Sequence, residues 1–341
     1  MSNKELLTSS YDFSLPKELI ATHPANPRDS AKLLVYNRAT GEVSHLKFSD
    51  LETLIPKDCA LIFNDTKVIK ARLFGKKESG GKIELLINRA LNAHDVNVYI
   101  RGKVKIGTEI FFADDLVAIV KELHEDGSRV VNFYQNATAL RFEELLPIID
   151  NIGHIPLPPY IQREDNKEDE SEYQSVFAKE EGAVAAPTAS LHFTKEQHER
   201  VCKNFAHAYV TLHVGSGTFK PVECETITEH PMHSEYYAIS DAAKKLLDSD
   251  IKILSIGTTS TRTVEFYARS KKQRGEANLF LHPNNRPLRV DHLLTNFHLP
   301  KSTLLMLVAS FTGLEKAQEL YKTAIEKKYR FYSYGDAMLI L

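Results

Sequence analysis

The sequence has little of what a disulfide-rich or thiolate-metal protein is built from. Its 341 residues include three cysteines, Cys59, Cys202 and Cys224, which are far apart and form no C-x-x-C pair. An odd number of scattered cysteines predicts neither a disulfide framework nor a cysteine-bound metal. We therefore interpret all three as buried or unreactive thiols.

Long apolar stretches are also missing. The opening residues, MSNKELLTSSYDFSLP, lack the apolar segment of a signal peptide. No apolar run approaches the roughly 18 residues that indicate a membrane span. Hydrophobic residues make up 43% of the chain and charged residues 26%, which is ordinary for one or two globular domains. These features predict a cytoplasmic protein with no membrane partner.

Several well-known loop motifs are absent. Gly215-Ser-Gly217 and Gly257-Thr-Thr-Ser260 each follow a predicted strand, yet neither is a Walker A loop or a complete G-x-G-x-x-G. No serine lies in a G-x-S-x-G elbow, so a serine hydrolase has little support. The backbone N–H groups of both turns can cradle an anion, and hydroxyls at the second turn can cap the helix that follows. Tight turns without a ligand explain most such sequences.

The charges are unevenly placed along the chain. A net charge of −2 argues against a generic nucleic-acid binder. From Lys67 to Lys105 there are ten Lys or Arg residues and three Asp or Glu residues. From Ile106 to Asp150 there are three Lys or Arg residues and nine Asp or Glu residues. This asymmetry indicates one positive face, although a solvated strand face without a ligand explains it equally well.

The middle of the chain has the pattern of a small all-β module. Short β-prone segments alternate with Gly, Asn and Asp turns, and a helical period is convincing only from Leu140 to Leu146. Antiparallel strands at this spacing predict a small barrel or sandwich. We place this module at residues 67–147, inserted between the two parts of one domain, residues 1–66 and 148–341.

The two flanking parts alternate strands with helices. Strands are predicted at 59–63, 206–213, 251–256 and 337–340, and helices at 194–204, 257–271, 302–311 and 314–327. This alternation predicts an α/β fold, a mixed sheet with flanking helices. The acidic, hydrophilic loop Arg163–Glu172 is expected to be mobile.

A polar strand end dominates the second part. The segment TLHVGSGTFKP (211–221) ends a β-prone run in glycines, hydroxyls and an imidazole, and HPMHSE (230–235) follows. The second segment has zinc-ligand side chains, but Pro231 makes it a turn. Imidazole titrates near neutral pH, which favours proton transfer or hydrogen bonding to a polar ligand. The candidates, each with a structural hydrogen bond as its alternative, are His213, His230, His233 and His298.

Eight strings stand out when the chain is taken from end to end. They are NDTKV (64–68), GHIPLPPYI (153–161), APTASLHFT (186–194), TLHVGSGTFKP (211–221), HPMHSE (230–235), GTTSTR (257–262), TNFHLPKST (295–303) and YRFYSYGD (329–336). In this order they closely resemble one family, the S-adenosylmethionine:tRNA ribosyltransferase-isomerases of queuosine biosynthesis. Three features depart from that pattern: Ser190 stands where glycine is usual, the segment Leu279–Arg289 lacks a Pro-Gly pair, and the loop Arg163–Glu172 is longer and more acidic.

The resemblance implies a fold and a reaction. The fold is an α/β domain with an inserted β-barrel, in agreement with the boundaries above. The reaction transfers and isomerises the ribosyl group of S-adenosylmethionine onto 7-aminomethyl-7-deazaguanine at the tRNA wobble position, giving epoxyqueuosine, adenine and methionine. S-adenosylmethionine is then a consumed cosubstrate, and this chemistry requires no redox cofactor or metal. We expect a monomer.

The matched motifs also imply site residues. Proton transfer is expected from His213, His230 and His233, with Glu235 orienting one of them. Substrate polar groups are expected to bind Gly215, Gly217, Thr218, Thr258, Thr259, Arg262, Asn296 and His298. On the basis of charge, tRNA phosphates are expected to contact Lys70, Arg72, Lys76, Lys77, Lys82 and Arg330.

Two other functional classes stay open. An S-adenosylmethionine-dependent RNA methyltransferase would use the same cosubstrate, but the sequence has no glycine-rich loop after a first strand with an acidic residue at the end of the next strand. A non-catalytic RNA-binding module would explain the basic segment and leave the histidine strings without a role. The products separate the classes, because a methyltransferase releases S-adenosylhomocysteine.

Overall fold

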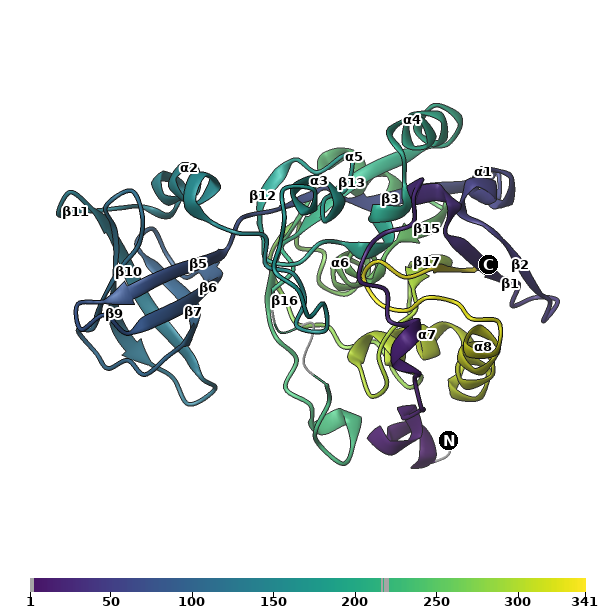
Figure 1. Ribbon diagram of the computed structural model, residues 1–341. Coiled ribbons are helices and arrows are strands. Elements are labelled where there is room, and N and C mark those ends of the chain that lie inside the picture. Colours follow the sequence, from purple (N-terminus) through teal and green to yellow (C-terminus); the bar gives the residue numbers. More distant parts are fainter. Residues whose placement is uncertain (1–2, 216, 218–220) are drawn as a thin grey trace.

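A nine-stranded mixed sheet forms the larger part of the molecule (Figure 1). The structure is a computed structural model that describes residues 3–215, 217 and 221–341. In spatial order the strands of this sheet are β16 (Arg274–Ala277), β14 (Glu235–Ile239), β13 (His207–Leu212), β3 (Cys59–Asn64), β15 (Lys252–Ile256), β17 (His292–Asn296), β18 (Ala337–Ile340), β1 (Lys32–Tyr36) and β2 (Val43–Lys47).

The four central strands of the sheet run in the same direction. Strand β3 pairs in parallel with β13 on one side and with β15 on the other, and β15 pairs in parallel with β17. Their carboxyl ends therefore lie along one edge, called the carboxyl edge below, where open α/β sheets bind ligands. Because β14 is antiparallel to β13, its first residue, Glu235, lies at the same edge.

Helices cover both faces of the sheet. Strand β3 shows why, since all six of its residues are buried and its side chains alternate between two apolar clusters. One cluster receives Ala60 and Ile62 and is closed by α5 (Asp241–Leu247), α6 (Thr258–Ser270), α7 (Thr303–Thr312) and α8 (Leu314–Glu326). The other receives Leu61 and Phe63 and is closed by α1 (Leu51–Leu54) and α4 (Lys195–Asn204). The predicted α/β fold with flanking helices is confirmed.

A six-stranded antiparallel barrel forms the second lobe, drawn in blue in Figure 1. The strand order of this lobe is β10-β7-β6-β5-β8-β9, and β9 pairs with β10 to close the barrel. Of the two predicted architectures, barrel and sandwich, the barrel is confirmed. Helix α2 (Phe142–Ile152) contributes Leu145 and Ile149 to the barrel core and runs past the helix end predicted at Leu146. The strands are β5 (Arg72–Lys77), β6 (Lys82–Ala90), β7 (Asp95–Arg101), β8 (Glu109–Phe111), β9 (Leu116–Leu123) and β10 (Ser128–Gln135), with β11 (Thr138–Ala139) paired to β10.

Two chain segments join the lobes and lie against each other. Residues Arg72 and His154 form an isolated bridge, and a Cβ atom at Gly153 would lie 2.2 Å from the carbonyl oxygen of Lys70. Glycine is therefore required where the returning chain crosses the outgoing one. Beside this crossing, β4 (Thr66–Val68) and β12 (Glu180–Ala183) form a two-stranded parallel ribbon. Domain limits at 67 and 147 stay a prediction.

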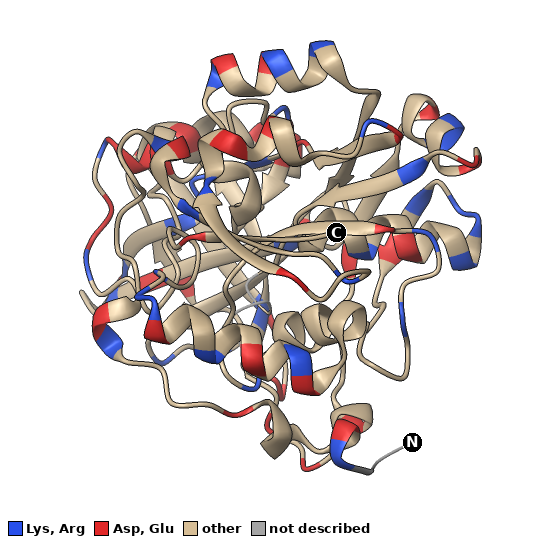
Figure 2. Cartoon of the chain, turned by 90° about the vertical axis from the view of Figure 1, so that its right-hand side faces the viewer, with Lys and Arg blue, Asp and Glu red and all other residues tan. Residues whose placement is uncertain are grey.

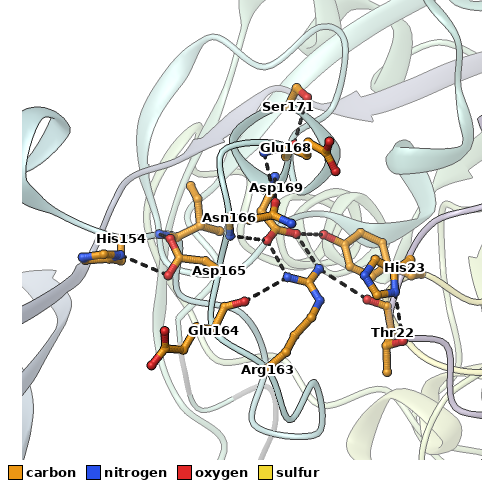
Figure 3. Close-up of polar contacts among 12 residues, drawn as sticks. Thr22, His23, His154, Arg163, Glu164, Asp165, Asn166, Glu168, Asp169 and Ser171 are labelled. Atoms are coloured by element: carbon orange, nitrogen blue, oxygen red, sulfur yellow. Dashed lines mark hydrogen bonds and ion pairs between the residues drawn. The ribbon is translucent and has the colours of Figure 1, made fainter.

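The acidic loop Arg163–Glu172 is anchored by a buried carboxylate. Asp169, at the start of α3 (Asp169–Glu172), is fully buried and accepts two hydrogen bonds from Arg163, at 2.6 and 2.7 Å (Figure 3). It also accepts from the Asn166 amide at 2.9 Å and the Tyr334 hydroxyl at 3.2 Å. An ionised group with this many donors anchors the loop at Asp169, and the mobility of the rest of the loop stays a prediction.

The remaining described elements are short. They are 3-10 turns at Asn3–Leu6, Thr8–Tyr11, Lys17–Leu19, Arg28–Ser30, Phe48–Asp50, Thr188–His192 and Ile227–Glu229. Among the described residues, no helix is both long and apolar enough to span a bilayer.

Glu265 joins helix α6 to the loop that precedes β17, which yields a stability prediction. This carboxylate is fully buried and accepts from Arg269 and from the backbone amides of Leu288, Arg289 and Val290, each amide at 2.7 Å. Glu265→Ala leaves these donors unpaired and should lower the free energy of unfolding by about 3–5 kcal/mol. Urea denaturation followed by circular dichroism measures the loss.

The matched control is Glu319→Ala. Glu319 forms an exposed pair with Lys316, so its loss should cost about 0–1 kcal/mol. Equal losses in the two variants would contradict the assigned role of Glu265.

Candidate active site between the sheet and the barrel

A cavity of about 740 Å³ lies between the carboxyl edge and the barrel. Five of the predicted residues line it from the side of the sheet: His213, Gly215, Gly217, His233 and Glu235. The barrel side carries polar residues that the sequence did not single out, among them Asn88, Asn97, Tyr99, His124, Asp126 and Ser128. Both lobes therefore build one concave, polar site of the size that small-molecule ligands occupy.

His213 projects from the end of β13 and is held on three sides. Its Nδ1 atom lies 2.8 Å from the Thr66 hydroxyl, and its ring stacks on Tyr236 with 5.5 Å between the centroids. Gly182 lies on the third side of the ring and has a φ of +147°. A Cβ atom at this position would lie 2.9 Å from His213 Nε2, so only glycine leaves room for the ring. The ring is thus fixed in orientation, as a proton-transfer group requires.

The partner of Nδ1 decides which nitrogen of His213 can act. The Thr66 hydroxyl also faces the Glu180 carbonyl at 3.5 Å, so it can donate there and accept from Nδ1–H. The lone pair is then on Nε2, to which no described residue makes a hydrogen bond. Burial lowers the pKa of His213, and the nearby Glu180 carboxylate opposes that effect. His213 is consequently a neutral base near pH 7.

Glu235 lies between helix α6 and the backbone that follows β13. Its carboxylate forms a buried ion pair with Arg262 of α6, and its Oε1 accepts the Gly215 amide at 2.9 Å. We expected Glu235 to orient a histidine and Arg262 to bind the substrate. The two residues bind each other, Glu235 also binds the backbone after β13, and both expected roles stay predictions. Arg262 also donates to the Leu279 carbonyl, and its Nη2 is buried without a partner among the described residues.

His233 lies over the glycine turn at the rim of the cavity. A Cβ at Gly217 would lie 2.3 Å from Cδ2 of the His233 ring, so only glycine fits beneath it. His233 is exposed and, like His213, lines the large cavity. Thr218, a predicted substrate contact, lies outside the described residues.

His230 does not share the cavity of His213. It lines a separate hollow with Met232, Phe280 and His282, and its ring meets Phe280 edge-on at 6.1 Å. Burial lowers the pKa of His230, with a smaller contribution from His233. The two histidines of HPMHSE therefore point into different hollows. Among the described residues, no three His, Cys, Asp or Glu side chains are grouped so that they could hold a metal ion.

The other predicted contacts line a second cavity of about 60 Å³ at the same edge of the sheet. It contains Thr258, Thr259, Asn296 and His298, together with Tyr160 and Tyr332, whose rings lie 4.2 Å apart. Val214 lines this cavity, whereas its neighbours His213 and Gly215 line the large one. The strand ends are thus adjacent, but their side chains divide between two spaces.

Groups in the small cavity are largely committed to one another. Thr259 accepts from Asn64 at 3.1 Å, and Asn64 also donates to the Leu212 carbonyl, which ties β3 to β13 and α6. His298 contacts the Thr295 hydroxyl at 2.8 Å, and burial lowers its pKa to about 3. A histidine this resistant to protonation is a fixed hydrogen-bonding group and not an acid at neutral pH.

Comparison with known proteins identifies the family. Residues 8–340 match the family model described as "Queuosine biosynthesis protein". The chain is 80% identical to the S-adenosylmethionine:tRNA ribosyltransferase-isomerase of Sulfurimonas denitrificans over the full length of both. It is 61% identical to that of Nitratiruptor sp. over 98% of this chain and 99% of the relative.

The chain belongs to the S-adenosylmethionine:tRNA ribosyltransferase-isomerase family.

A solved structure is similar over nearly the whole chain. The crystal structure of the S-adenosylmethionine tRNA ribosyltransferase from Thermotoga maritima is 32% identical and covers 97% of this chain and 100% of that one, with a TM-score of 0.53. The resemblance inferred from the eight strings is confirmed, and so is the fold class of this ribosyltransferase-isomerase family member.

The predicted basic residues fall into two groups. Lys70 is paired with Glu170 at 3.1 Å and Arg72 with Glu84 at 3.4 Å, whereas Arg330, in the other lobe, faces Asp336 at 3.6 Å. Lys76 and Lys82 instead pair across β5 and β6 and are exposed. Lys77 donates to the Lys103 carbonyl at 3.0 Å. On the end of the molecule that faces away from the barrel, basic and acidic residues are interspersed (Figure 2).

The environment of His213 predicts its titration. Because burial disfavours the imidazolium ion, the pKa of His213 should lie below 6.5. Glu180→Gln removes the opposing charge and should lower this pKa further. Ring-proton NMR chemical shifts across pH 4–8 measure both values, and a His213 pKa at or above 6.5 would contradict the described burial.

Proposed function

We propose that this protein transfers and isomerises the ribosyl group of S-adenosylmethionine onto 7-aminomethyl-7-deazaguanine in tRNA, in queuosine biosynthesis. Epoxyqueuosine-tRNA, adenine and methionine are the products. The observation that carries this proposal is the cavity in which a fixed, neutral His213 faces a polar wall of the barrel. Full-length identity of 80% to an enzyme of that name supports the same activity.

His213 is the proposed base. The positive sulfonium of S-adenosylmethionine acidifies the adjacent 5′ carbon, and Nε2 of His213 takes a proton from it. Adenine leaves with a proton, for which His233 at the rim of the cavity is the proposed donor. The amine of the modified base then bonds to the sugar-derived carbon skeleton and loses a proton. An oxygen of that skeleton closes the epoxide on the carbon that carried sulfur, and methionine departs with the electrons of the broken carbon–sulfur bond. None of these steps is an oxidation or reduction of the cosubstrate by an external redox partner, so the reaction calls for no redox cofactor.

The large cavity is the proposed place of the adenosyl group. Ligand pockets have volumes of roughly 300–1,000 Å³, a range that includes 740 Å³ and excludes 60 Å³. Gly215 and Gly217 line this cavity without side chains, so a polar end of the cosubstrate can approach the backbone closely there. The small cavity, with Thr258, Asn296 and His298, lies next to it and is the proposed place of a shorter polar end.

The exposed strand face of the barrel is the proposed tRNA contact. Lys76 and Lys82 lie side by side on β5 and β6, where they add positive charge without a buried ion pair. Phosphate contacts release counterions, so binding through them weakens steeply with salt.

Substitution of His213 tests the proposed reaction. His213→Gln keeps a polar side chain but removes the base, so adenine release should fall by roughly 10²- to 10⁴-fold. Mass spectrometry of the tRNA and liquid chromatography of the small products measure turnover. The control is His45→Gln. His45 lies on β2, an edge strand on the other side of the sheet from β13, and its ring contacts the Tyr329 hydroxyl.

Two results would overturn the proposal. One is normal turnover in His213→Gln. The other is S-adenosylhomocysteine among the products of the unmodified protein, which would make it a methyltransferase.

Removal of the two exposed lysines tests the tRNA contact. In Lys76→Gln/Lys82→Gln the slope of log Kd against log salt should become shallower by about 1.4–1.8, the loss of two phosphate contacts. The matched control is Lys195→Gln/Lys203→Gln, which removes the same charge from exposed positions on α4. Equal slopes in the two double variants would place the RNA elsewhere.

A further inference from the structure

The barrel wall of the cavity contains a built-in irregularity at Asn88. Strand β6 pairs regularly with β7 up to Ile87, opposite Val98, and resumes at Arg89, opposite Asn97, so Asn88 is the extra residue of a β-bulge. A bulge redirects one side chain out of the regular alternation and is common beside active sites. Here the redirected carboxamide lines the 740 Å³ cavity.

Asn88 is paired with a second carboxamide on the neighbouring strand. Its Nδ2 atom donates to Asn97 Oδ1 at 2.9 Å. This bond fixes Asn97 with its own Nδ2 group turned away from Asn88, and no described residue accepts from that group. Asn97 is 7% exposed and also lines the cavity. This amide group has no acceptor among the described residues, so it can donate to a ligand or water in the cavity.

The carboxamide pair faces the proposed catalytic turn. A Cβ at Gly215 would lie 3.4 Å from Asn88 Oδ1 and 3.9 Å from Glu235 Oε1. The next residue of β6, Arg89, pairs with Glu276 of β16 at 2.9 Å and so holds the bulge against the sheet. A flat ring between the lobes would thus have the carboxamides along one edge and the turn after His213 along another.

We propose that the Asn88–Asn97 pair binds the nucleobase of the tRNA, with Asn97 Nδ2 donating to its lactam oxygen. This inference rests on the proposed function. A 7-deazaguanine ring has carbon in place of N7, so the exocyclic oxygen is the acceptor on that edge, beside the carbon that bears the aminomethyl group. A carboxamide donor on this oxygen positions the reacting amine next to it. Enzymes that act on an extruded base read it by such hydrogen bonds.

Asn97→Asp is the sharpest test. The replacement keeps an oxygen that accepts from Asn88 but turns the outward donor into an acceptor, so a purely structural link survives it. Binding is measured by fluorescence anisotropy with anticodon stem-loops carrying either guanine or adenine at the wobble position. The unsubstituted protein should prefer guanine, whose oxygen accepts, and Asn97→Asp should lose at least about tenfold of that preference because adenine offers an amino group there.

The control is Asn37→Asp. Asn37 accepts from the amides of Ala39 and Thr40 through Oδ1, so this variant keeps its accepted bonds and adds the same charge far from the cavity. Its base preference should be unchanged. Asn97→Ala, checked for folding by circular dichroism, should lose the preference without any added charge.

The binding assay needs no turnover, which separates two failures. If Asn97→Asp keeps the preference for guanine, the carboxamide pair is a structural link and the inference is wrong. If the preference changes as expected but the unsubstituted protein releases no adenine with tRNA carrying the modified base, the base site stands and the proposed reaction fails.

Discussion

The site depends on one buried ion pair, between Glu235 and Arg262. Glu235 begins β14, Arg262 lies on α6, and the second carboxylate oxygen holds the amide of Gly215 after β13. Three elements far apart in the sequence are therefore joined at the carboxyl edge by one carboxylate. Removing two charges from water costs several kcal/mol, which their mutual attraction must offset. Loss of one partner leaves the other as an unpaired buried charge. The pair is better explained by the position it gives to the glycine turn than by net stability.

Sheet topology explains why the polar strand ends come together. Parallel pairing of β13, β3, β15 and β17 brings their carboxyl ends to one edge, and the barrel is attached close to that edge through β4 and β12. The candidate site thus lies between the two lobes, with the proposed proton-transfer groups on the sheet and carboxamides on the barrel. This division matches a reaction with two large substrates that must meet at one point.

Much of the fold followed from local pattern. The five apolar residues 59–63 predicted a strand, and the turn-punctuated middle predicted an all-β insertion; both are confirmed. The predicted helix start at Thr194 is confirmed, because its hydroxyl accepts from the Gln197 amide at 3.1 Å, but the Gln197 side chain donates to the Phe48 carbonyl and completes no capping box. These features depend on residues within a few positions of each other, which is the range in which periodicity and capping are informative.

The site was less predictable because its contacts are non-local. The partner of Glu235 is 27 residues away on α6, and the hydroxyls expected to cap that helix donate backward instead, Ser260 to the Ile256 carbonyl and Thr261 to that of Gly257. His230 lies three residues from His233 but faces another hollow, and spacing along the chain alone does not show this. Asn88 gave no sequence signal, since a bulge is defined by its pairing with a neighbouring strand.

A crystal structure of the protein with a non-transferable amine analogue of S-adenosylmethionine tests the central claim most directly. The account predicts the adenosyl group in the 740 Å³ cavity, with its 5′ carbon within about 3.5 Å of His213 Nε2. An adenosyl group bound in the hollow of His230 and Phe280, or away from the seam between the lobes, would contradict it.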